Sequence, residues 1–312
     1  NAPLAARMRP RNLDEFVGQK DFIGPGKLLR RMLDAGSLSS LIFFGPPGTG
    51  KTSLATIIAG IVNAKFNYLS APAATVADIR AVIQKAKDNL ISSNVKTVLF
   101  IDEIHRFNRA QQDVLLDDVE KGVLILIGAT TENPYFAINS PLISRSTVFE
   151  FTSLNKNDIV ELLKRALKDS KRGLGTLDIR ASEDALEYIA IMSDGDARKA
   201  LTALEIGVMS QKNTGAKVIK FDLETAKESI QQKSIVFDPT GDTHYDLASA
   251  LQKSMRGSDP DATVYWLARL IAGGQDPRFI ARRIAVCAAE DVGNADPLAT
   301  VLAASAVQIS EF

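Results

Sequence analysis

The sequence predicts an α/β domain with a parallel sheet, followed by two all-α regions. Over residues 1–150, short β-rich apolar runs alternate with segments of helical periodicity, which is typical of a parallel sheet covered by helices. Beyond Phe151 almost every pattern is helical, and the turn-rich segment Asn213–Lys217 interrupts it. The predicted domains are therefore residues 1–151, 152–215 and 216–312.

Length and composition agree with a globular protein of several domains. The chain has 312 residues, of which 46% are hydrophobic and 24% are charged, with 37 basic and 37 acidic side chains. At roughly 100–200 residues per domain, this length suggests two or three domains. Because the net charge is zero, a surface for nucleic acid would have to come from local clustering of basic residues.

The cysteine and histidine content argues against several kinds of site. Cys287 is the single cysteine, so an internal disulfide cannot form, and two histidines without a CxxC motif suggest no metal site. No apolar run approaches the ~20 residues of a membrane span, and no signal peptide is visible, so we expect no membrane partner. The chain starts without Met and ends in Glu311-Phe312, which suggests an expressed fragment.

Strand-sized apolar runs and helical patterns predict the individual elements. The predicted strands are Leu41–Phe44, Phe66–Leu69, Val98–Ile101 and Val123–Ile127. The helical segments between them are Ser53–Val62, Val76–Asn89 and Arg109–Glu120. In the second region, Asn155 and Ser182 are good N-caps for two amphipathic runs, Lys156–Ala166 and Glu183–Met192.

A glycine-rich loop follows the first predicted strand. Residues 45–52 read Gly-Pro-Pro-Gly-Thr-Gly-Lys-Thr and match the phosphate-binding pattern G-x-x-x-x-G-K-[ST] between a strand and a helix. Backbone N–H groups at the helix start attract phosphate, and glycine lets the chain approach it closely. A Gly/Pro-rich turn with a chance lysine is the alternative. The predicted ATP-binding residues here are Gly45, Pro46, Pro47, Gly48, Thr49, Gly50, Lys51, Thr52 and Ser53.

Two carboxylates, Asp102 and Glu103, stand at the end of the third predicted strand. Together with the glycine-rich loop, they predict an α/β P-loop NTPase. In such a site Lys51 would contact the β- and γ-phosphates, while Thr52 and Asp102 would hold Mg²⁺. Glu103 would be the general base toward water, a role that needs a carboxylate free of metal. A strand that merely ends in solvated acids is the alternative. We expect the adjacent His105 to help packing or positioning, not catalysis.

Further polar residues are candidates for contacts with the γ-phosphate. The fourth predicted strand runs into residues 128–134, whose tip could lie between the phosphate loop and the acidic pair, although Asn-Pro is also a turn signal. Arg145 follows a helix end and could project into a neighbouring subunit's ATP site, or be a surface arginine. Arg198 could reach back from the second domain, or be solvated at a helix start capped by Asp194 or Asp196.

Several stretches outside the phosphate loop carry a family resemblance. They are Leu4–Pro10, Val17–Gln19, Phe100–Asn108, Gln111–Asp113, Gly128–Pro134, Gly241–Asp246, Arg256–Asp261 and Glu290–Pro297. On these residues the chain resembles the replication-associated recombination protein A family of AAA+ ATPases, also called MgsA, the relatives of eukaryotic Werner-helicase-interacting protein. The last three stretches are not generic to P-loop proteins.

The resemblance implies an AAA+ αβα ATPase domain, an all-α lid and a C-terminally truncated, all-α oligomerisation domain that assembles tetramers. It implies ATP and Mg²⁺ as cofactors, DNA-stimulated hydrolysis at stalled or gapped replication forks and recombination intermediates, and single-stranded-DNA-binding protein as a partner. The location would be the cytoplasm or nucleoid in bacteria and the nucleus in eukaryotes. By the same resemblance, Val17 and Gly18 would line the adenine pocket, Thr131 would be sensor 1, Arg145 the arginine finger in trans, and Arg198 sensor 2.

The DNA-binding surface is less defined by the sequence. The family often has Leu-Pro-His where this chain has Leu116-Asp117-Asp118, which adds negative charge to a helix that could face DNA. Arg278, Arg282 and Arg283 could contact phosphates, and Trp266 could stack on a base. A solvated arginine face and a core tryptophan are the favoured interpretations.

Two other functions share the nucleotide-binding motifs. An ATP-gated assembly scaffold would bind ATP with incidental turnover, but such a protein would not need Glu103. A clamp-loader subunit has the same motif set, and the segments around His244-Tyr245 and Arg256–Asp261 argue against it on family grounds.

Overall fold

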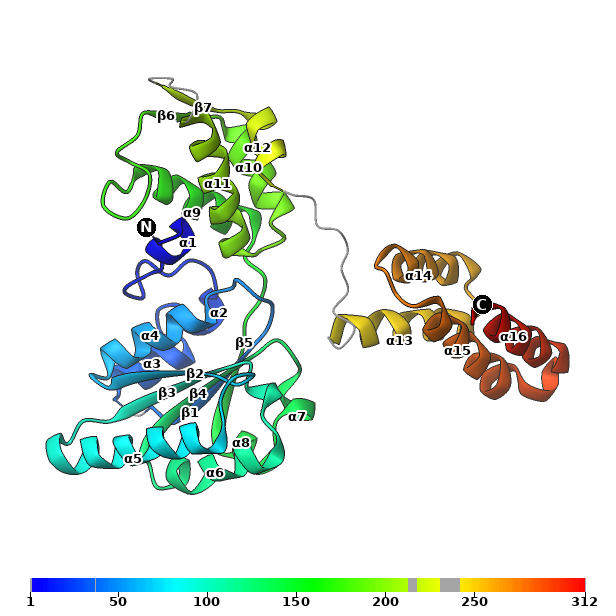
Figure 1. The fold of residues 1–312 in the computed structure, drawn as a ribbon, viewed down its shortest axis with the longest axis horizontal. Helices are drawn as coiled ribbons and strands as arrows, with labels where there is room; N and C mark the ends of the chain where they lie inside the picture. Colours follow the sequence, from blue (N-terminus) through cyan, green and yellow to red (C-terminus); the bar gives the residue numbers. More distant parts are fainter. Residues whose placement is uncertain (1, 37, 213–217, 231–241, 312) are drawn as a thin grey trace. The chain divides into compact units, whose positions relative to one another are not determined.

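The computed structural model describes residues 2–36, 38–212, 218–230 and 242–311 (Figure 1). The chain divides into two compact units, residues 1–231 and residues 232–312. The expected connector Asn213–Lys217, which contains the predicted boundary at residues 215 and 216, lies outside the described residues, as does Gly241.

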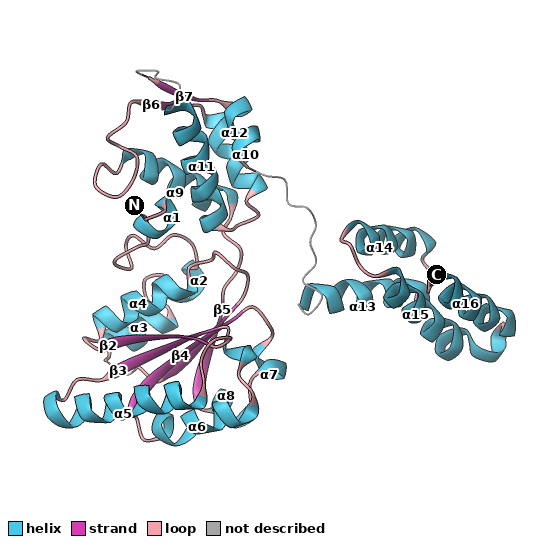
Figure 2. Ribbon diagram, in the orientation of Figure 1, coloured by secondary structure: helices cyan, strands magenta, loops and turns pink. Residues whose placement is uncertain are grey.

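A five-stranded parallel sheet forms the base of the first unit (Figure 2). Its strands are β1 (Ser40–Phe44), β2 (Lys65–Ser70), β3 (Thr97–Asp102), β4 (Leu124–Thr130) and β5 (Ser146–Glu150). Their order is β2-β3-β4-β1-β5, and each neighbouring pair runs parallel. The four predicted strands are confirmed. Edge strand β5 was not predicted because Val148 and Phe149 are its only apolar residues, so no apolar run marks it.

Helices cover both faces of this sheet. On one face lie α2 (Lys20–Ile23), α3 (Leu28–Asp34) and α4 (Lys51–Ile61), and on the other lie α5 (Val76–Ser93) and α6 (Arg109–Glu120). Phe43 of β1 is buried in the first core, and its neighbour Ile42 is buried in the second. This alternation explains why the central strands read as continuous apolar runs. The short helices η1 (Ile104–Arg106), α7 (Pro134–Ala137) and α8 (Ser140–Ser144) complete the layer.

A helical lid follows the sheet within the same unit. It contains α9 (Lys156–Lys168), α10 (Glu183–Met192), α11 (Ala197–Lys212) and α12 (Leu223–Ser229). Asn155 and Ser182 cap α9 and α10 as predicted, each accepting a backbone hydrogen bond from the first turn of its helix. The N-terminal helix α1 (Leu4–Arg7) buries Leu4 completely in the lid core.

The lid is not purely helical, and it extends past the expected boundary at 215–216. Strand β6 (Ile179–Ala181) pairs in parallel with β7 (Ile219–Phe221), and α12 packs against α10 and α11. Residues 219–229 therefore lie in the first compact unit. A three-residue strand is too short to produce a periodic signal, and its partner is distant in sequence, so tertiary packing alone brings the two together.

The second unit is helical wherever it is described. Its helices are α13 (Asp242–Arg256), α14 (Pro260–Ala272), α15 (Pro277–Cys287) and α16 (Pro297–Ser310), with the short helical turns η2 (Ala288–Val292) and η3 (Gly293–Ala295). Trp266 packs against the small core of this unit, while Arg278 is exposed and paired with Asp276. Both findings agree with the favoured interpretations. Within the described residues, no helix combines the length and apolar character needed to cross a bilayer.

Candidate active site

The loop between β1 and α4 forms a cradle at the carboxyl edge of the sheet. Loops at this edge are the usual ligand site of an open parallel sheet. Gly48 and Gly50 have φ angles of +71° and +101°, a left-handed region that other residues rarely adopt. A β-carbon on Gly48 would collide with the carboxylate of Asp196, and one on Gly50 would lie 2.6 Å from the Phe16 ring. Backbone conformation and lack of space both require glycine here.

Lys51, the first residue of α4, folds back onto this loop. Its ammonium group donates hydrogen bonds to the carbonyl oxygens of Gly45 (2.6 Å) and Pro46 (2.7 Å). Burial lowers the pKa of Lys51 to about 8, and the carboxylates of Asp102 and Asp196 oppose this effect. A bound phosphate would favour the charged form of this partly desolvated ammonium group, so the site suits an anion.

The acidic pair lies at the end of β3, and its two carboxylates have different surroundings. Asp102 is partly buried, and one of its oxygens accepts a hydrogen bond from the Tyr68 hydroxyl at 3.2 Å. Burial, followed by the Asp102 charge, raises the pKa of Tyr68. Glu103 is exposed and has a left-handed backbone with φ of +54°. Within the described part of the chain its carboxylate has no hydrogen-bond partner, so it is available to accept a proton.

The end of β4 lies between the phosphate loop and the acidic pair, as predicted. The reason is that β4 lies between β1, which leads into the loop, and β3, which leads into the acidic pair. The Thr130 hydroxyl is 2.9 Å from Nδ1 of His105, and the other ring nitrogen of His105 lies 3.4 Å from the Glu132 carboxylate. Thr131 is exposed and lines the cavity described next. His105 thus connects the turn after Glu103 with the end of β4, which agrees with the expected positioning role.

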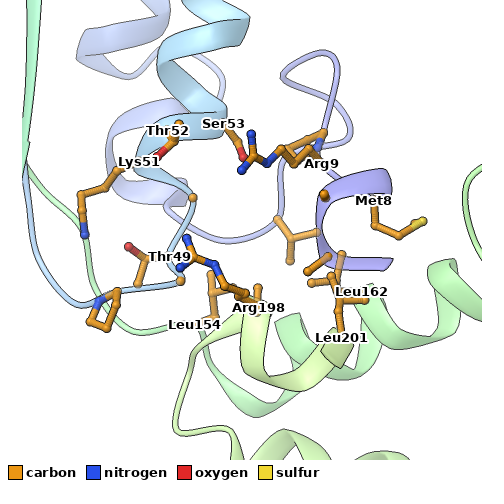
Figure 3. Close-up of a pocket in the computed structure, with 18 of the residues that line it drawn as sticks. Met8, Arg9, Thr49, Lys51, Thr52, Ser53, Leu154, Leu162, Arg198 and Leu201 are labelled. Atoms are coloured by element: carbon orange, nitrogen blue, oxygen red, sulfur yellow. The ribbon is translucent and has the colours of Figure 1, made fainter. Parts of the chain in front are cut away.

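A cavity of about 590 Å³ opens over these groups (Figure 3). The phosphate loop from Pro47 to Ser53 lines it together with Asp102, Glu103 and Thr131. Another part of the lining is apolar and consists of Met8, Val17, Leu154, Leu162 and Leu201. Such a combination of apolar lining and a few polar groups is typical of small-ligand sites, and the apolar part suits a base.

Three predicted binding residues lie beside the cavity but do not line it. Gly18 contacts Leu154, a lining residue, so closely that a β-carbon at position 18 would collide with it. Gly45 and Pro46 instead supply the carbonyl oxygens that hold Lys51. These residues support the site from outside.

Arg198 reaches the cavity from the lid. It lies in the first turn of α11, and Figure 3 shows its side chain directed toward the loop at Thr49. Asp196 caps this helix by accepting hydrogen bonds from the backbone N–H groups of Arg198 (2.8 Å) and Lys199 (3.1 Å). The backbone N–H of Ala197, which precedes Arg198, donates to the Gly48 carbonyl at 3.2 Å. Capping by Asp196 and an approach of Arg198 to the phosphate loop therefore occur together.

Arg145 lies apart from the cavity of its own chain. Its guanidinium pairs with Glu120 of α6 at 3.1 Å and donates to the Pro141 carbonyl at 2.9 Å. The side chain is 37% exposed and is not among the cavity-lining residues. A contact between Arg145 and nucleotide would therefore require a second copy of the chain.

Sequence analysis did not identify Arg9, Phe16 or Tyr68 as parts of the site. Arg9 lines the cavity, and its side chain points toward Ser53 in Figure 3. Phe16 also lines the cavity and touches Gly50. Tyr68 reaches Asp102 because β2 pairs with β3 in a register that places Tyr68 opposite Phe100. No motif signals these contacts, since they depend on strand pairing and on the course of the N-terminal segment.

The residues in the cavity fit ATP and Mg²⁺. The left-handed glycines form a space that any side chain would fill, and Lys51 supplies a cation beside it. Thr52 and Asp102 offer the oxygen ligands that Mg²⁺ prefers when it also binds phosphates. Fold and site together define a P-loop ATPase of the AAA+ class.

Comparison with protein families agrees with an AAA+ ATPase and points to a particular family within that class. The family described as "ATPase family associated with various cellular activities (AAA)" matches residues 41–154. An "AAA C-terminal domain" matches residues 175–256, and "MgsA AAA+ ATPase C terminal" matches residues 257–312.

Curated relatives are similar over nearly the whole chain. Replication-associated recombination protein A of Haemophilus influenzae is 47% identical over 305 residues, which is 97% of this chain and 68% of the relative. The protein of the same name from Escherichia coli is 47% identical with the same coverage, and ATPase WRNIP1 of Dictyostelium discoideum is 41% identical over 100% of this chain and 37% of its own length. The chain belongs to the replication-associated recombination protein A family.

The fold is also similar to solved structures. The RuvB Holliday junction branch migration motor of Thermotoga maritima matches with a TM-score of 0.58 and 26% identity, covering 80% of this chain and 81% of that one. This likeness agrees with the αβα sheet domain and the helical regions that follow it.

Proposed function

We propose that this chain is a DNA-dependent ATPase that acts on stalled or gapped replication forks and recombination intermediates. The ATPase part of this proposal rests on the cavity at the phosphate loop, which Lys51, Asp102 and Glu103 line together. The names of the relatives support a role in replication-associated recombination, and the similar RuvB structure is described as a branch migration motor.

In this proposal Glu103 takes a proton from the attacking water. Its carboxylate lines the cavity and has no hydrogen-bond partner among the residues that the structure describes, so it remains free to act as a base. Lys51 and Arg198 would stabilise negative charge on the phosphates, and Thr131 would orient the water or γ-phosphate. His105 holds Thr130, and with it the end of the strand that carries Thr131.

Thr52 and Asp102 would hold Mg²⁺, which when bound offsets the charge of the β- and γ-phosphates. Tyr68 donates its hydrogen bond to one oxygen of Asp102 and so fixes the orientation of that carboxylate. Val17 and its apolar neighbours would bind the adenine, with Gly18 keeping Leu154 in place.

The active form would be a homo-oligomer, most simply the tetramer expected from the replication-associated recombination protein A family. The position of Arg145 supports this part of the proposal, since its side chain is exposed and lies outside its own cavity. Single-stranded-DNA-binding protein is the proposed protein partner, and single-stranded or gapped DNA the proposed nucleic-acid partner.

Steady-state hydrolysis measured with single-stranded, gapped and forked DNA tests the proposal. Wild-type turnover should rise with at least one of these DNAs, and Lys51→Ala and Glu103→Gln should abolish it. Glu187→Gln is the matched control, because Glu187 is an exposed lid residue that pairs with Lys156. Wild-type protein whose turnover responds to none of these DNAs would contradict the DNA-dependent part.

A scaffold that uses ATP only to assemble is the competing function. In that case Glu103→Gln would still bind ATP, form the same oligomer and retain full activity in cells. The free carboxylate in the cavity favours hydrolysis instead, since a protein that only binds ATP has no use for a base.

A further inference from the structure

Three arginines on α5, η1 and α6 lack an acidic partner within the described residues. They are Arg80 on α5, Arg106 at the end of η1 and Arg109 at the start of α6, and all three are exposed. Two other cations of the same layer are paired, Lys87 with Asp118 at 2.8 Å and Lys121 with Asp117 at 2.7 Å, whereas Lys85 of α5 is exposed and in no ion pair among the described residues. The three arginines have no structural role in ion pairing that would explain them.

The three side chains belong to one region, where α5 and α6 begin. The Gln111 side chain donates to the Ala74 carbonyl at 2.9 Å, which ties the start of α6 to the loop before α5. Arg80 lies on the side of α5 that faces α6, because Lys87, two turns further along, reaches Asp118 of α6. Arg106 and Arg109 flank the start of α6 itself. Two helix N-termini add their positive dipole ends to this region.

Of the acidic side chains nearby, Asp78, Asp113 and Asp118 are engaged in bonds of their own, whereas Glu103 is exposed and has no such partner among the described residues. Asp78 accepts hydrogen bonds from the backbone and hydroxyl of Thr75 as part of a capping box. Asp113 accepts a bond from the Asn139 side chain at 2.8 Å. Asp118 is buried against Lys87, whereas Asp117 is exposed and pairs with Lys121, so Asp117 alone places on the surface the negative charge that the sequence suggested. These bonds leave the carboxylates charged, so attraction for an anion here would come from the three guanidinium groups and the two helix N-termini.

Arg106 is also connected to the acidic pair through the backbone. Its N–H donates to the Glu103 carbonyl at 2.8 Å, which closes the turn that holds Glu103 in its left-handed conformation. Between them, His105 contacts Thr130 at the end of β4. A ligand that moves Arg106 would thus act on the same turn that positions the general base.

We propose that Arg80, Arg106 and Arg109 bind the phosphate backbone of DNA, and that DNA bound there stimulates hydrolysis through the Glu103 turn. The inference rests on the proposed function and assigns a surface to it. Guanidinium groups suit phosphates because they offer paired donors and keep their charge. Contacts of this kind give affinity without reading base sequence, so the surface would accept different DNA sequences equally.

The test compares three triple variants with wild type. Fluorescence anisotropy of a labelled single-stranded oligonucleotide, measured at increasing salt, gives their DNA affinity. Arg80→Gln/Arg106→Gln/Arg109→Gln should bind at least about tenfold more weakly, and its salt slope should fall by roughly 2, since each lost phosphate contact contributes about 0.7 for single strands. Stimulation of hydrolysis by the same DNA should be lost in parallel.

The matched control removes three exposed cations from the opposite face of the sheet, namely Lys20, Lys27 and Arg31 around α2 and α3. Replacing these with Gln should leave the affinity and the salt slope within twofold of wild type. A second control, with Arg80, Arg106 and Arg109 all replaced by Lys, keeps the charge and should keep most of the salt slope. Loss of binding in the Lys variant equal to that in the Gln variant would indicate structural damage and count against a phosphate surface.

The outcomes separate the two proposals. If wild-type protein neither binds nor responds to DNA, the proposed function itself fails. If wild-type hydrolysis responds to DNA and the Gln variant responds equally with the same salt slope, the DNA surface lies elsewhere and this inference is overturned. A changed oligomer mass with unchanged DNA affinity would show that the three arginines face another subunit, which also overturns it.

Discussion

Gly48 meets two separate constraints at the residue scale. Its φ of +71° disfavours any β-carbon, and the carboxylate of Asp196 fills the space where that carbon would lie. The same carboxylate caps α11 and lies close enough to Lys51 to oppose the lowering of its pKa. One glycine therefore lets the lid and the phosphate loop approach each other.

Gly48→Ala should weaken ATP binding by at least about tenfold, because the left-handed conformation alone costs an L-residue ~1–2 kcal/mol. Titration with a fluorescent ATP analogue measures this change. Gly60→Ala is the matched control: Gly60 lies on the exposed side of α4, and no atom lies within 4 Å of an added β-carbon. The control should bind normally and be stabilised by up to about 1 kcal/mol. Equal affinity of both variants would contradict the role of Gly48.

ATP affinity should also depend on the charge of Lys51. Burial lowers the pKa of Lys51 to about 8 in the chain without nucleotide, so the group is charged below this pH and increasingly neutral above it. Bound phosphate favours the ammonium form, so binding above this pH requires uptake of a proton. Affinity should be constant below about pH 7 and fall as pH rises through about 8.

Lys51→Arg separates this effect from other titrations, since arginine stays charged over the whole range. The variant should bind ATP with an affinity that no longer falls between about pH 7 and pH 9. If its affinity declines with the same profile as the wild type, a different group is responsible for the pH dependence.

At the scale of elements, sequence signals work where a local pattern is long or chemically specific. The buried strands β1, β3 and β4 carry continuous apolar runs, and helix α6 begins and ends where the pattern predicts. The N-caps of α9 and α10 were predictable because the capping side chain bonds to its own first turn. Strands β5, β6 and β7 gave no signal, because two apolar residues or a length of three residues leave no pattern to detect.

Strand β7 makes a testable contribution to the lid. Phe221 at its end is fully buried among α10, α11 and α12, so Phe221→Ala should lower the free energy of unfolding of the first unit by about 3–5 kcal/mol. Urea unfolding monitored by circular dichroism measures this change. Phe136→Ala is the control, because Phe136 is 89% exposed and its replacement should change stability by no more than about 0.5 kcal/mol.

A small effect of Phe221→Ala, comparable with that of the control, would mean that residues 219–229 do not belong to the folded lid. The expected boundary at 215–216 would then be the better division of the chain. The present contacts, in which β7 pairs with β6, support the later division.

At the scale of the whole molecule, Arg145, the proposed finger arginine, is not among the described residues that line the cavity. Arg145 is held by Glu120 and Pro141 at a distance from the cavity lining. This arrangement supports the proposal that hydrolysis takes place between copies of the chain, where Arg145 of one copy completes the site of the next.

Mixing two inactive variants tests completion of the site between subunits. Arg145→Ala should lower turnover by about 10³-fold, as loss of an arginine finger does, and Lys51→Ala should abolish it. Mixed oligomers of the two should recover part of the activity, because some interfaces combine an intact cavity with an intact Arg145. A mixture that stays as inactive as its components, although mass measurement shows mixed oligomers, would exclude a role for Arg145 in trans.

The sequence by itself determined the nucleotide chemistry of this protein, because the glycine-rich loop, Lys51 and the Asp102-Glu103 pair are local motifs whose spacing is set by one loop and one strand end. It also determined the family, since matching stretches extend along the whole chain. Tertiary structure alone decided that Tyr68 holds Asp102, that Asp196 meets Gly48, and that Gln111 ties the start of α6 to the loop before α5. These contacts join segments far apart in sequence through strand register and helix packing, which no local pattern specifies.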